Sequence, residues 1–581
     1  MKLLHLLPAV GLLVLTATAP RPAAAQNAPA WAQAIECRSN IVLDYVACDA
    51  ASNTYTAGYV RDTARLGSFR VVPGGLLGNS GQYLFNGFVA KLDAQGSAQW
   101  LQTLAAPGSG TEAFVAGLTV DAAGNSLLCG GYRNGPLTLG STTLPANAID
   151  VNKMQGVVAK LDPAGYVLWA ERVGGSGGNS IFLNGIAQSA TGTVYVGISF
   201  DPTASTADSG LGIVSFNSNG GLRYFYNFPG VSRLPGSPYG PFGAIKRLEV
   251  NPTTGQVGVI GDFFGTLTLR NAGSAGPAIA FTSPPEPQRG AFVAGLDPAT
   301  GAVQWAQEQT STGISTGGNS RSYANRLTGL AVAGAGFATM GVYLGTGTLA
   351  GQPLPASGID TSRVVLARFD GQGQLLGRSI LSSDGDPDSQ LLGVALSTDA
   401  AGDLHLSGSF TGAMSAGSGG LRSSGPAGTY DGFVVRYSGQ GQRLGQQAVG
   451  GAGSKSISAL ALDGTGQPRI AGTYSFVATI GSQPVPASVG RFANGYIARL
   501  ARTPLAVRVA GPAASALQAY PNPARPEPPC RCASPPVQPR KRYACSTYWG
   551  KPCSRKPWLR APTRPCCPPP GWPRAATCSR P

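Results

Sequence analysis

Histidine is nearly absent from this chain of 581 residues, which contains two, His5 and His405. His5 stands in an apolar N-terminal segment. His405 stands alone in the alternating stretch DLHLSG, where a hydrogen-bonded or exposed strand histidine is expected. Nucleophilic triads usually need histidine as general base, no His/Cys cluster has zinc-ligand spacing, and no glycine-rich phosphate loop follows a strand and opens a helix. We therefore assign no catalytic, cofactor or metal residue, and an enzyme is the less favoured interpretation.

Charged residues are also scarce, at 12% of the chain, whereas glycine is abundant, with 83 residues. Glycine is unfavourable inside helices and suits tight turns. The segments between the glycines are rich in Val, Leu, Thr and Tyr, which favour strands. This composition predicts an all-β protein with many turns.

The net charge of +16 and the cysteines are concentrated near the C-terminus. Residues 525–581 contain twelve Lys or Arg and one acidic residue, Glu527, and seven of the ten cysteines lie between Cys530 and Cys578. The charge of the remaining body is unremarkable, so no nucleic-acid partner is predicted. The cysteines of the body are Cys37, Cys48 and Cys129.

The N-terminal segment has the features of a signal peptide. Lys2 is followed by the apolar run LLHLLPAVGLLVLTATA and by the small-residue sequence AAAQ, which places cleavage near Ala25. The apolar run is too short and wrongly flanked for a good membrane span. Residues 1–25 therefore predict export, with no transmembrane span after cleavage.

One segment recurs along the body of the chain. Each copy is an alternating apolar strand, a turn that carries glycine, and a second strand, which predicts a β-hairpin. The copy NGYIARLA (494–501) stops before its second strand. The clearest copies are NGFVAKLDAQGSAQW (86–100), QGVVAKLDPAGYVLW (155–169) and GAFVAGLDPATGAVQW (290–305), with weaker ones at 210–225, 362–377 and 431–445.

A second hairpin segment falls between these copies. Examples are GLTVDAAGNSLLCGGY (117–132) and ALALDGTGQPRIAGTY (459–474). Two hairpins make a four-stranded unit, and such units follow one another along the chain. Their spacing is typical of propeller blades that carry long loops.

The ends of the array predict how it closes. The last hairpin lacks its second strand, and PAWAQAIE (29–36) resembles the second strands VQWAQEQT (303–310) and VLWAERVG (167–174). The strand at Trp31 can complete the final unit, which closes a ring without an unpaired edge. We predict a seven-bladed β-propeller over residues 26–502. An open β-solenoid is the alternative, although solenoids cap their ends rather than exchange strands.

Two residue types recur at fixed positions in the repeat. The tryptophans stand in the second strand of the hairpin and are expected to act as large apolar wedges between blades. The aspartates precede the hairpin turns and are expected to cap them, with calcium ligation as the alternative. These structural residues are Trp31, Trp100, Trp169 and Trp305, and Asp93, Asp162, Asp297 and Asp370.

Two cysteines bracket the exit from the closing strand. Cys37 and Cys48 would both enter an oxidising compartment after export, so they are a candidate disulfide that fixes the ring closure. Cys129 is expected to be a small buried apolar residue.

The repeated modules, GFVAKLD…G…W and D..GN.Y..G.F, resemble those of secreted bacterial β-propeller repeat proteins. The resemblance covers about residues 31–502 and implies architecture and cell-surface export more than an activity. LDPATGAVQW (296–305) also resembles the tryptophan-docking motif of quinoprotein dehydrogenases, whose propellers bind pyrroloquinoline quinone. That motif is structural in those enzymes too, and only this copy matches it well.

The stretch ALQAYPNPA (516–524) resembles the start of the C-terminal sorting domain of type IX secretion substrates. The later motifs of that domain, L.L.D..G..V and L..G.Y.V, are missing from the Pro-, Cys- and Arg-rich tail. Read in a shifted frame, residues 542–553 can encode LRLFDLLGQTV, and residues 571–578 can encode LAPGSYL. We interpret 503–515 as a linker and 516–581 as a truncated, frameshifted and disordered sorting domain. With the frame intact, the secretion machinery would bring the chain to the cell surface; otherwise it would stay periplasmic.

Three classes of function follow from these patterns. The favoured one is an exported, non-catalytic binding or adhesion module that holds a glycan or a protein through rim loops such as 70–84 and 229–243. The second is a propeller enzyme, such as a lyase or a quinone-dependent dehydrogenase. The third is a structural part of the cell envelope.

Overall fold

The computed structural model describes residues 30–501, with gaps at 76–83, 106–108, 175–179, 201–209, 238–240, 272–275, 285–287, 314–324, 358–361, 384–389, 416–419, 452, 476–478, 481–482 and 489–492. These residues belong to one compact unit, Met1–Arg508. The predicted signal peptide (1–25), linker (503–515) and sorting segment (516–581) lie outside the described residues.

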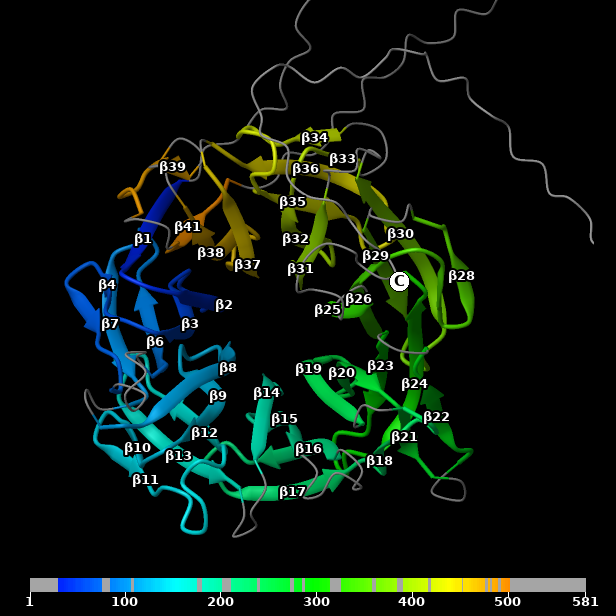
Figure 1. Ribbon diagram of the computed structural model, residues 1–581, viewed down its shortest axis with the longest axis horizontal. Helices are drawn as coiled ribbons and strands as arrows, with labels where there is room; N and C mark the ends of the chain where they lie inside the picture. Colours follow the sequence, from blue (N-terminus) through cyan, green and yellow to red (C-terminus); the bar gives the residue numbers. More distant parts are fainter. Residues whose placement is uncertain are drawn as a thin grey trace, which may run out of the picture. The chain divides into compact units, whose positions relative to one another are not determined.

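All regular elements of the described residues are β-strands, and they form four-stranded antiparallel sheets arranged as blades around a ring (Figure 1). Seven sheets of this kind are present in the described part of the chain, and each contains one copy of both hairpin repeats. The predicted all-β propeller is confirmed. No helix that could span a membrane is found among these residues.

The blades are numbered in chain order, and each is given from its inner to its outer strand. Blade 1 has β2 (Ile41–Cys48), β3 (Thr54–Val60), β6 (Asn86–Leu92) and β7 (Ala98–Thr103); blade 2 has β8 (Glu112–Val120), β9 (Ser126–Arg133), β12 (Gln155–Leu161) and β13 (Val167–Val173). Blade 3 has β14 (Ile181–Gln188), β15 (Val194–Phe200), β16 (Gly210–Phe216) and β17 (Leu222–Asn227); blade 4 has β19 (Phe242–Val250), β20 (Val257–Phe264), β23 (Gly290–Leu296) and β24 (Val303–Ser311).

The last three blades follow the same plan. Blade 5 has β25 (Arg326–Ala333), β26 (Gly336–Tyr343), β29 (Arg363–Phe369) and β30 (Leu375–Ser383); blade 6 has β31 (Leu391–Thr398), β32 (Leu404–Phe410), β35 (Asp431–Tyr437) and β36 (Arg443–Val449). Blade 7 has β37 (Lys455–Leu462), β38 (Pro468–Tyr474), β41 (Asn494–Arg499) and, as its outer strand, β1 (Trp31–Cys37).

The strand exchange predicted at the ring closure is confirmed. Strand β1 pairs antiparallel with β41, in a register that runs from Trp31 opposite Arg499 to Ile35 opposite Gly495. The Ala30 N–H extends this pairing with a hydrogen bond to the Arg499 carbonyl (2.7 Å). The first and the last described strands of the chain therefore belong to one blade.

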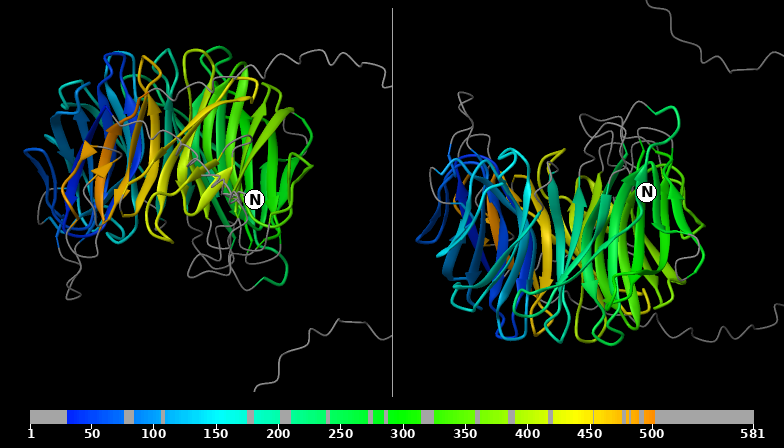
Figure 2. Two further views of the ribbon diagram at one scale, coloured as in Figure 1. Left: turned by 90° about the horizontal axis from the view of Figure 1, so that it is seen from above. Right: turned by 90° about the horizontal axis from the view of Figure 1, so that it is seen from below.

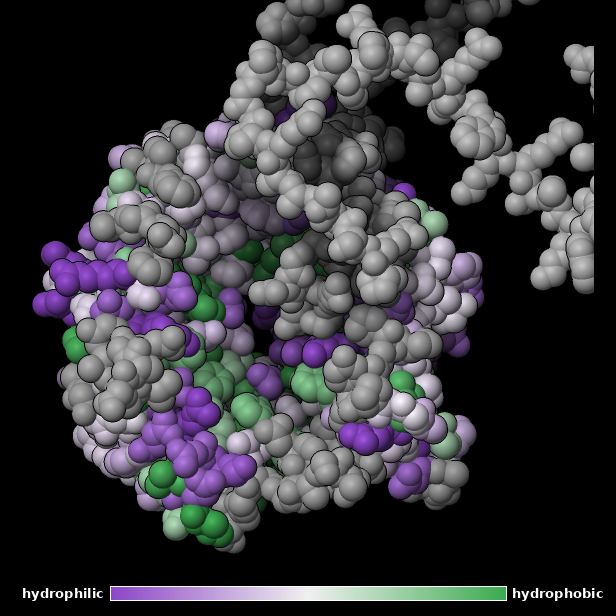
Figure 3. Space-filling model, viewed as in Figure 1, coloured by the Kyte–Doolittle hydropathy of each residue, from purple (hydrophilic) through white to green (hydrophobic). Residues whose placement is uncertain are grey.

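The centre of the ring is hollowed in the space-filling view (Figure 3). Each inner strand carries a bulge near its middle, for example between Ile245 and Arg247 in β19. Bulges re-aim side chains locally. Here, side chains next to the bulges form hydrogen bonds between neighbouring blades. Arg247 Nε of blade 4 donates to the Thr328 carbonyl of blade 5 at 2.8 Å. The Ser458 hydroxyl of blade 7 donates to the Leu43 carbonyl of blade 1.

Short outer hairpins, which the sequence analysis did not identify, connect the second and third strands of six blades. In the side views of Figure 2 the long strands run roughly along the ring axis. Figure 1 shows these hairpins, for example β10 and β11, at the outside of the ring. They are β4 (Ala64–Leu66) with β5 (Phe69–Val71), β10 (Leu137–Leu139) with β11 (Thr142–Leu144), β21 (Thr266–Arg270) with β22 (Ile279–Thr282), β27 (Gly347–Leu349) with β28 (Gln352–Leu354), β33 (Ala413–Ser415) with β34 (Gly420–Arg422), and β39 (Thr479–Ile480) with β40 (Gln483–Pro484).

Several outer hairpins pair with the preceding blade rather than with their own. Strand β4 pairs with β1 of blade 7, β27 with β24 of blade 4, and β33 with β30 of blade 5. Strand β21 pairs with β18 (Gly230–Ser232), which follows the outer strand of blade 3. Each hairpin thus covers an edge that would otherwise expose unpaired backbone groups.

Candidate functional site

Each of the four predicted tryptophans docks its blade on the next one. Each indole lies on the outer turn of the following blade, over a glycine with positive φ: Trp31 on Gly96, Trp100 on Gly165, Trp169 on Gly220 and Trp305 on Gly373. A Cβ at these glycines would be 2.5–2.9 Å from the indole, so only glycine allows the contact. The indole N–H donates to the carbonyls of Ala94 (3.0 Å), Pro163 (3.0 Å) and Ser218 (3.1 Å) and, from Trp305, to Gln256 Oε1 (3.4 Å).

Other residues replace tryptophan between the remaining blades. Between blades 3 and 4, Tyr224 and Tyr226 lie on Gly301, the equivalent turn glycine. Between blades 5 and 6, the Arg368 guanidinium donates to the Gly439 carbonyl (2.7 Å). Between blades 6 and 7, the chain ends stand where the turn would be, and Gln447 Nε2 donates to the Ala501 carbonyl (3.3 Å). These replacements explain why the repeat has four tryptophans.

The predicted aspartates bind the backbone of their own turns. Asp93 Oδ1 accepts hydrogen bonds from the N–H groups of Gln95 (3.0 Å) and Ser97 (2.9 Å), and Asp162, Asp297 and Asp370 repeat this arrangement. Within the described ranges, no three acidic, histidine or cysteine side chains gather as a metal site would need.

The candidate disulfide between Cys37 and Cys48 is wrong, because both are free thiols. Cys37 ends β1 and Cys48 ends β2, and β2 carries the chain from one face of the ring to the other. Its seven residue steps span about 23 Å, whereas a disulfide needs Cα atoms within about 7 Å. Cys129 is fully buried in the core, as predicted.

His405 is fully buried, so the exposed alternative is wrong. Its Nε2 lies 3.3 Å from Asp399 Oδ2, and Arg436 Nη2 lies 3.4 Å from the same oxygen and 2.5 Å from Asp403. A Cβ on Gly466 of blade 7 would be 3.7 Å from Asp399 Cβ, which places this cluster between blades 6 and 7. The cluster therefore helps to hold blade 6 against blade 7.

This cluster predicts acid sensitivity. Burial holds the pKa of His405 below its usual 6.5, although Asp399 opposes the shift. The unfolded chain therefore binds a proton at higher pH than the folded chain, and stability falls as the pH drops below about 6.5. We expect the free energy of unfolding, measured by denaturant titration, to fall by up to about 1.4 kcal/mol per pH unit as the pH drops below about 6.5. His405→Gln should abolish this step. Hydrogen bonds from the backbone and from His405 lower the pKa of Asp399, so its contribution to stability in the unaltered chain is lost only below pH 3.8.

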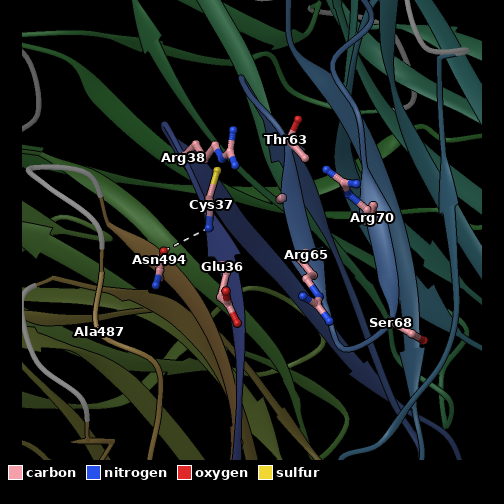
Figure 4. Close-up of a pocket in the computed structure, with 10 residues that line it drawn as sticks. Glu36, Cys37, Arg38, Thr63, Arg65, Ser68, Arg70, Ala487 and Asn494 are labelled. Atoms are coloured by element: carbon pink, nitrogen blue, oxygen red, sulfur yellow. Dashed lines mark hydrogen bonds between the residues drawn. The ribbon is translucent and has the colours of Figure 1, made fainter.

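A pocket of about 580 Å³ lies at the ring closure and is the candidate ligand site (Figure 4). The end of β1 provides Glu36, Cys37 and Arg38. The hairpin β4–β5 and the residue before it provide Thr63, Ala64, Arg65, Ser68 and Arg70. Blade 7 provides Ala487 and Asn494. The strand exchange thus brings the first strand of the chain, a blade 1 hairpin and the end of blade 7 to one place.

One cross-strand row holds most of the pocket's charge. Glu36 pairs with Arg65, and Arg65 pairs with Arg70, so the three side chains share the exposed face of neighbouring strands. Strands lie about 4.8 Å apart, and like charges directly opposite one another are destabilising. The alternate row, Cys37 with Ala64, faces the core.

The floor of the pocket is fixed by buried hydrogen bonds. Asn494, 2% exposed, accepts a hydrogen bond from the Cys37 N–H at 3.1 Å and donates to the Tyr474 hydroxyl at 3.1 Å. The thiol of Cys37 is held neutral, because burial raises its pKa. The pocket therefore has a rigid, uncharged base below a charged rim.

The arginines of this rim retain unused donors. Arg65 Nε donates to the Gly67 carbonyl (2.7 Å). Across the ranges that the structure describes, no carboxylate lies within ion-pair distance of Arg38, Arg65 or Arg70. A guanidinium has five N–H donors in a planar fork that matches carboxylate and sulfate oxygens. The arrangement suits an anionic ligand.

Ligand binding was predicted on the rim loops, whereas this pocket lies mainly on β1 and on the hairpin β4–β5. Among the described residues of the loop 70–84, the pocket contains only Arg70, and none of the described residues of the loop 229–243 lines it. A local signal was available, since the glycine turn in ARLGSFR sets the two arginines opposite each other.

No protein-family model matches the sequence, and no curated protein matches it. Solved structures with some similarity include a quinohemoprotein alcohol dehydrogenase of Pseudomonas putida HK5, with 10% identity and a TM-score of 0.35 over 86% of this chain and 79% of that one. A gluconolactonase of Xanthomonas campestris has 14% identity and a TM-score of 0.25 over 65% of this chain and 90% of its own. Likenesses this low say nothing about the activity of this chain.

Proposed function

We propose that this chain is a non-catalytic propeller that binds an acidic glycan in the pocket at its ring closure. The observation that carries the proposal is the Arg65–Arg70 pair, held face to face on neighbouring strands with no carboxylate within ion-pair distance among the described residues. The repulsion between them is relieved when an anionic group binds both. Arg38 adds a third positive charge at the same rim.

The other groups of the rim favour a sugar over an acidic peptide. Glu36 would repel a polyacidic peptide but accepts hydrogen bonds from sugar hydroxyls. The hydroxyls of Thr63 and Ser68 can donate or accept. A ligand that carries carboxylate or sulfate groups together with many hydroxyls satisfies both sets of side chains.

Binding also fits the chemistry of the pocket better than catalysis does. Its one thiol, Cys37, has a raised pKa, and a thiol is a weak nucleophile until it ionises. Export and display at the cell surface extend the proposal and rest on the sequence of residues 1–25 and 516–524. Display on the surface would place the pocket where extracellular acidic polysaccharides occur.

The double variant Arg65→Gln/Arg70→Gln tests this function. We expect the unaltered chain to bind polygalacturonate or heparin but not neutral dextran, and to bind more weakly as salt is raised. The double variant should bind at least about tenfold more weakly, because it loses charge-assisted hydrogen bonds. Calorimetric titration measures this.

Arg422→Gln is the matched control, because Arg422 is an exposed arginine on the outer hairpin β33–β34. It should bind as the unaltered chain does. Equal loss in the control, or equal binding of neutral dextran, would reject the pocket as the site.

A further inference from the structure

The outer hairpins insert aliphatic side chains between the blades. Hairpin β4–β5 buries Leu66 and Val71 between blades 7 and 1. Hairpin β10–β11 buries Leu137 and Leu139 between blades 1 and 2, next to Trp100. Each hairpin thus fills the space beside a docking residue.

We call the interface between two neighbouring blades a seam. Four other seams are filled in the same way. Leu267 and Leu269 are buried between blades 3 and 4, and Leu349 and Leu354 between blades 4 and 5. Met414 and Ile480, from the hairpins of blades 6 and 7, are buried in the clusters of their seams. Six of the seven seams therefore contain an aliphatic plug from an outer hairpin.

The hairpins cover one fixed position on the outer strand. It is Ala98 in blade 1 and Val167 in blade 2, and a Cβ on the hairpin turn glycine, Gly67 or Gly140, would be 3.6–3.7 Å from these side chains. In blade 5 the equivalent residue is Leu375, which packs in the cluster of Leu349 and Leu354.

The seam between blades 2 and 3 differs. Blade 3 has Leu222 at the covered position, and its side chain is 65% exposed. Phe225, 45% exposed, stacks on Phe200 with ring centroids 6.3 Å apart. A cavity of about 470 Å³ opens here, floored by Ile198 and Val214. We call this cavity the hairpin socket.

The neighbouring connections of the chain lack the large aliphatic side chains that fill the other seams. The connection of blade 3 that corresponds to the outer hairpins is 201–209, DPTASTADS, and the segment after β13 is 175–179, GSGGN. Neither contains a Leu, Ile, Val, Met or aromatic residue. Both lie outside the described residues.

We propose that the hairpin socket binds an extended segment of a partner protein, which presents two aliphatic side chains at alternate positions. Two of the other seams show what such a space accepts: β10 and β21 are short strands that bury both leucines of a Leu-X-Leu pattern, Leu137 with Leu139 and Leu267 with Leu269. Alternate side chains of an added strand enter pockets on one side, which is the usual source of specificity in strand addition. Glu171 and Arg172 stand at the rim of the socket and can pair with charges that flank the segment.

The chain's own hairpin supplies the probe. A labelled peptide of residues 135–146, GPLTLGSTTLPA, is titrated against the full-length chain, with fluorescence anisotropy as the readout. We expect saturable one-to-one binding with a Kd below about 1 mM. A peptide with Leu137→Ser and Leu139→Ser should not bind.

Three variants locate the binding. Leu222→Ser/Phe225→Ser should weaken it by roughly tenfold or more, because it removes exposed anchors without disturbing buried ones. Leu376→Ser, a 57% exposed leucine on the outer strand of blade 5, is the matched control and should leave binding unchanged. Replacement of residues 201–209 by the hairpin segment 134–147 should fill the socket, abolish binding and raise Tm.

Three results would overturn the proposal. One is the absence of saturable binding up to about 1 mM. The second is undiminished binding to the hairpin-replacement variant. The third is binding of a small apolar dye at Leu222 and Phe225 that the peptide cannot displace, which would make the socket a small-molecule pocket.

Discussion

A chain that begins at residue 38 should lose the ring. It lacks β1, so β41 loses its pairing from Trp31 to Ile35, and hairpin β4–β5 loses its partner at Glu36 and Cys37. The loss also exposes an apolar edge strand. We expect the unfolding midpoint in calorimetry to fall by more than about 10 °C, with association visible in size-exclusion chromatography.

A chain that begins at residue 30 is the control, because it retains all of β1. Its midpoint should equal that of the chain cleaved near Ala25. Equal midpoints for the chains that begin at 30 and at 38 would mean that strand exchange does not stabilise the propeller.

Trp305→Ala should be the most damaging single substitution among the docking residues. Trp305 is 7% exposed and has Phe369 and Phe337 at ring-centroid distances of 6.2 and 6.5 Å. Removal of a buried aromatic side chain leaves a cavity and costs about 3–5 kcal/mol. Urea denaturation should show this loss as a lower midpoint.

Trp305→Phe separates packing from hydrogen bonding. It keeps an aromatic ring on Gly373 but loses the N–H that donates to Gln256, so we expect a smaller loss than in the alanine variant. Trp31 is more exposed, so Trp31→Ala should cost less than Trp305→Ala. A loss below about 1 kcal/mol for Trp305→Ala would contradict the docking role.

The sequence predicted the parts of this fold that depend on neighbouring residues. Strand pairs such as β6 and β7 follow from alternation and from the turn Asp93–Gly96, where Oδ1 of the aspartate binds the turn backbone. The ring closure was predictable because Trp31 begins a strand of the repeat that has no preceding partner. Both signals are visible without knowledge of the tertiary structure.

Features formed between blades were not predictable in the same way. The outer hairpins have strands of two to five residues, too short for a periodic signal, and some pair with another blade. The tryptophans were recognised as wedges, but their partners are turns about 50 to 70 residues away. Cys37 and Cys48 are close in sequence and far apart in space, because a complete strand separates them.

The candidate site combines a local feature with contacts between blades. Arg65 and Arg70 meet through a local turn, but Glu36 and Asn494 reach them only through the exchanged strand. Sequence patterns could therefore have identified the arginine pair, while the pocket itself depends on contacts across 457 positions of the chain.

The position of the chain ends within blade 7 has a consequence for gene architecture. Ala30 and Ala501 stand where the other blades have a short turn between their third and fourth strands. A six-residue linker that begins Asp-X-X-Gly, placed between Leu500 and Ala30, would therefore join the ends, because residues 162–167 span the same distance in blade 2. New ends could be opened in the equivalent turn at Asp162. The ends of the propeller thus occupy one of several equivalent turns in a closed ring. A circular permutant with its ends in another of these turns should keep the same fold.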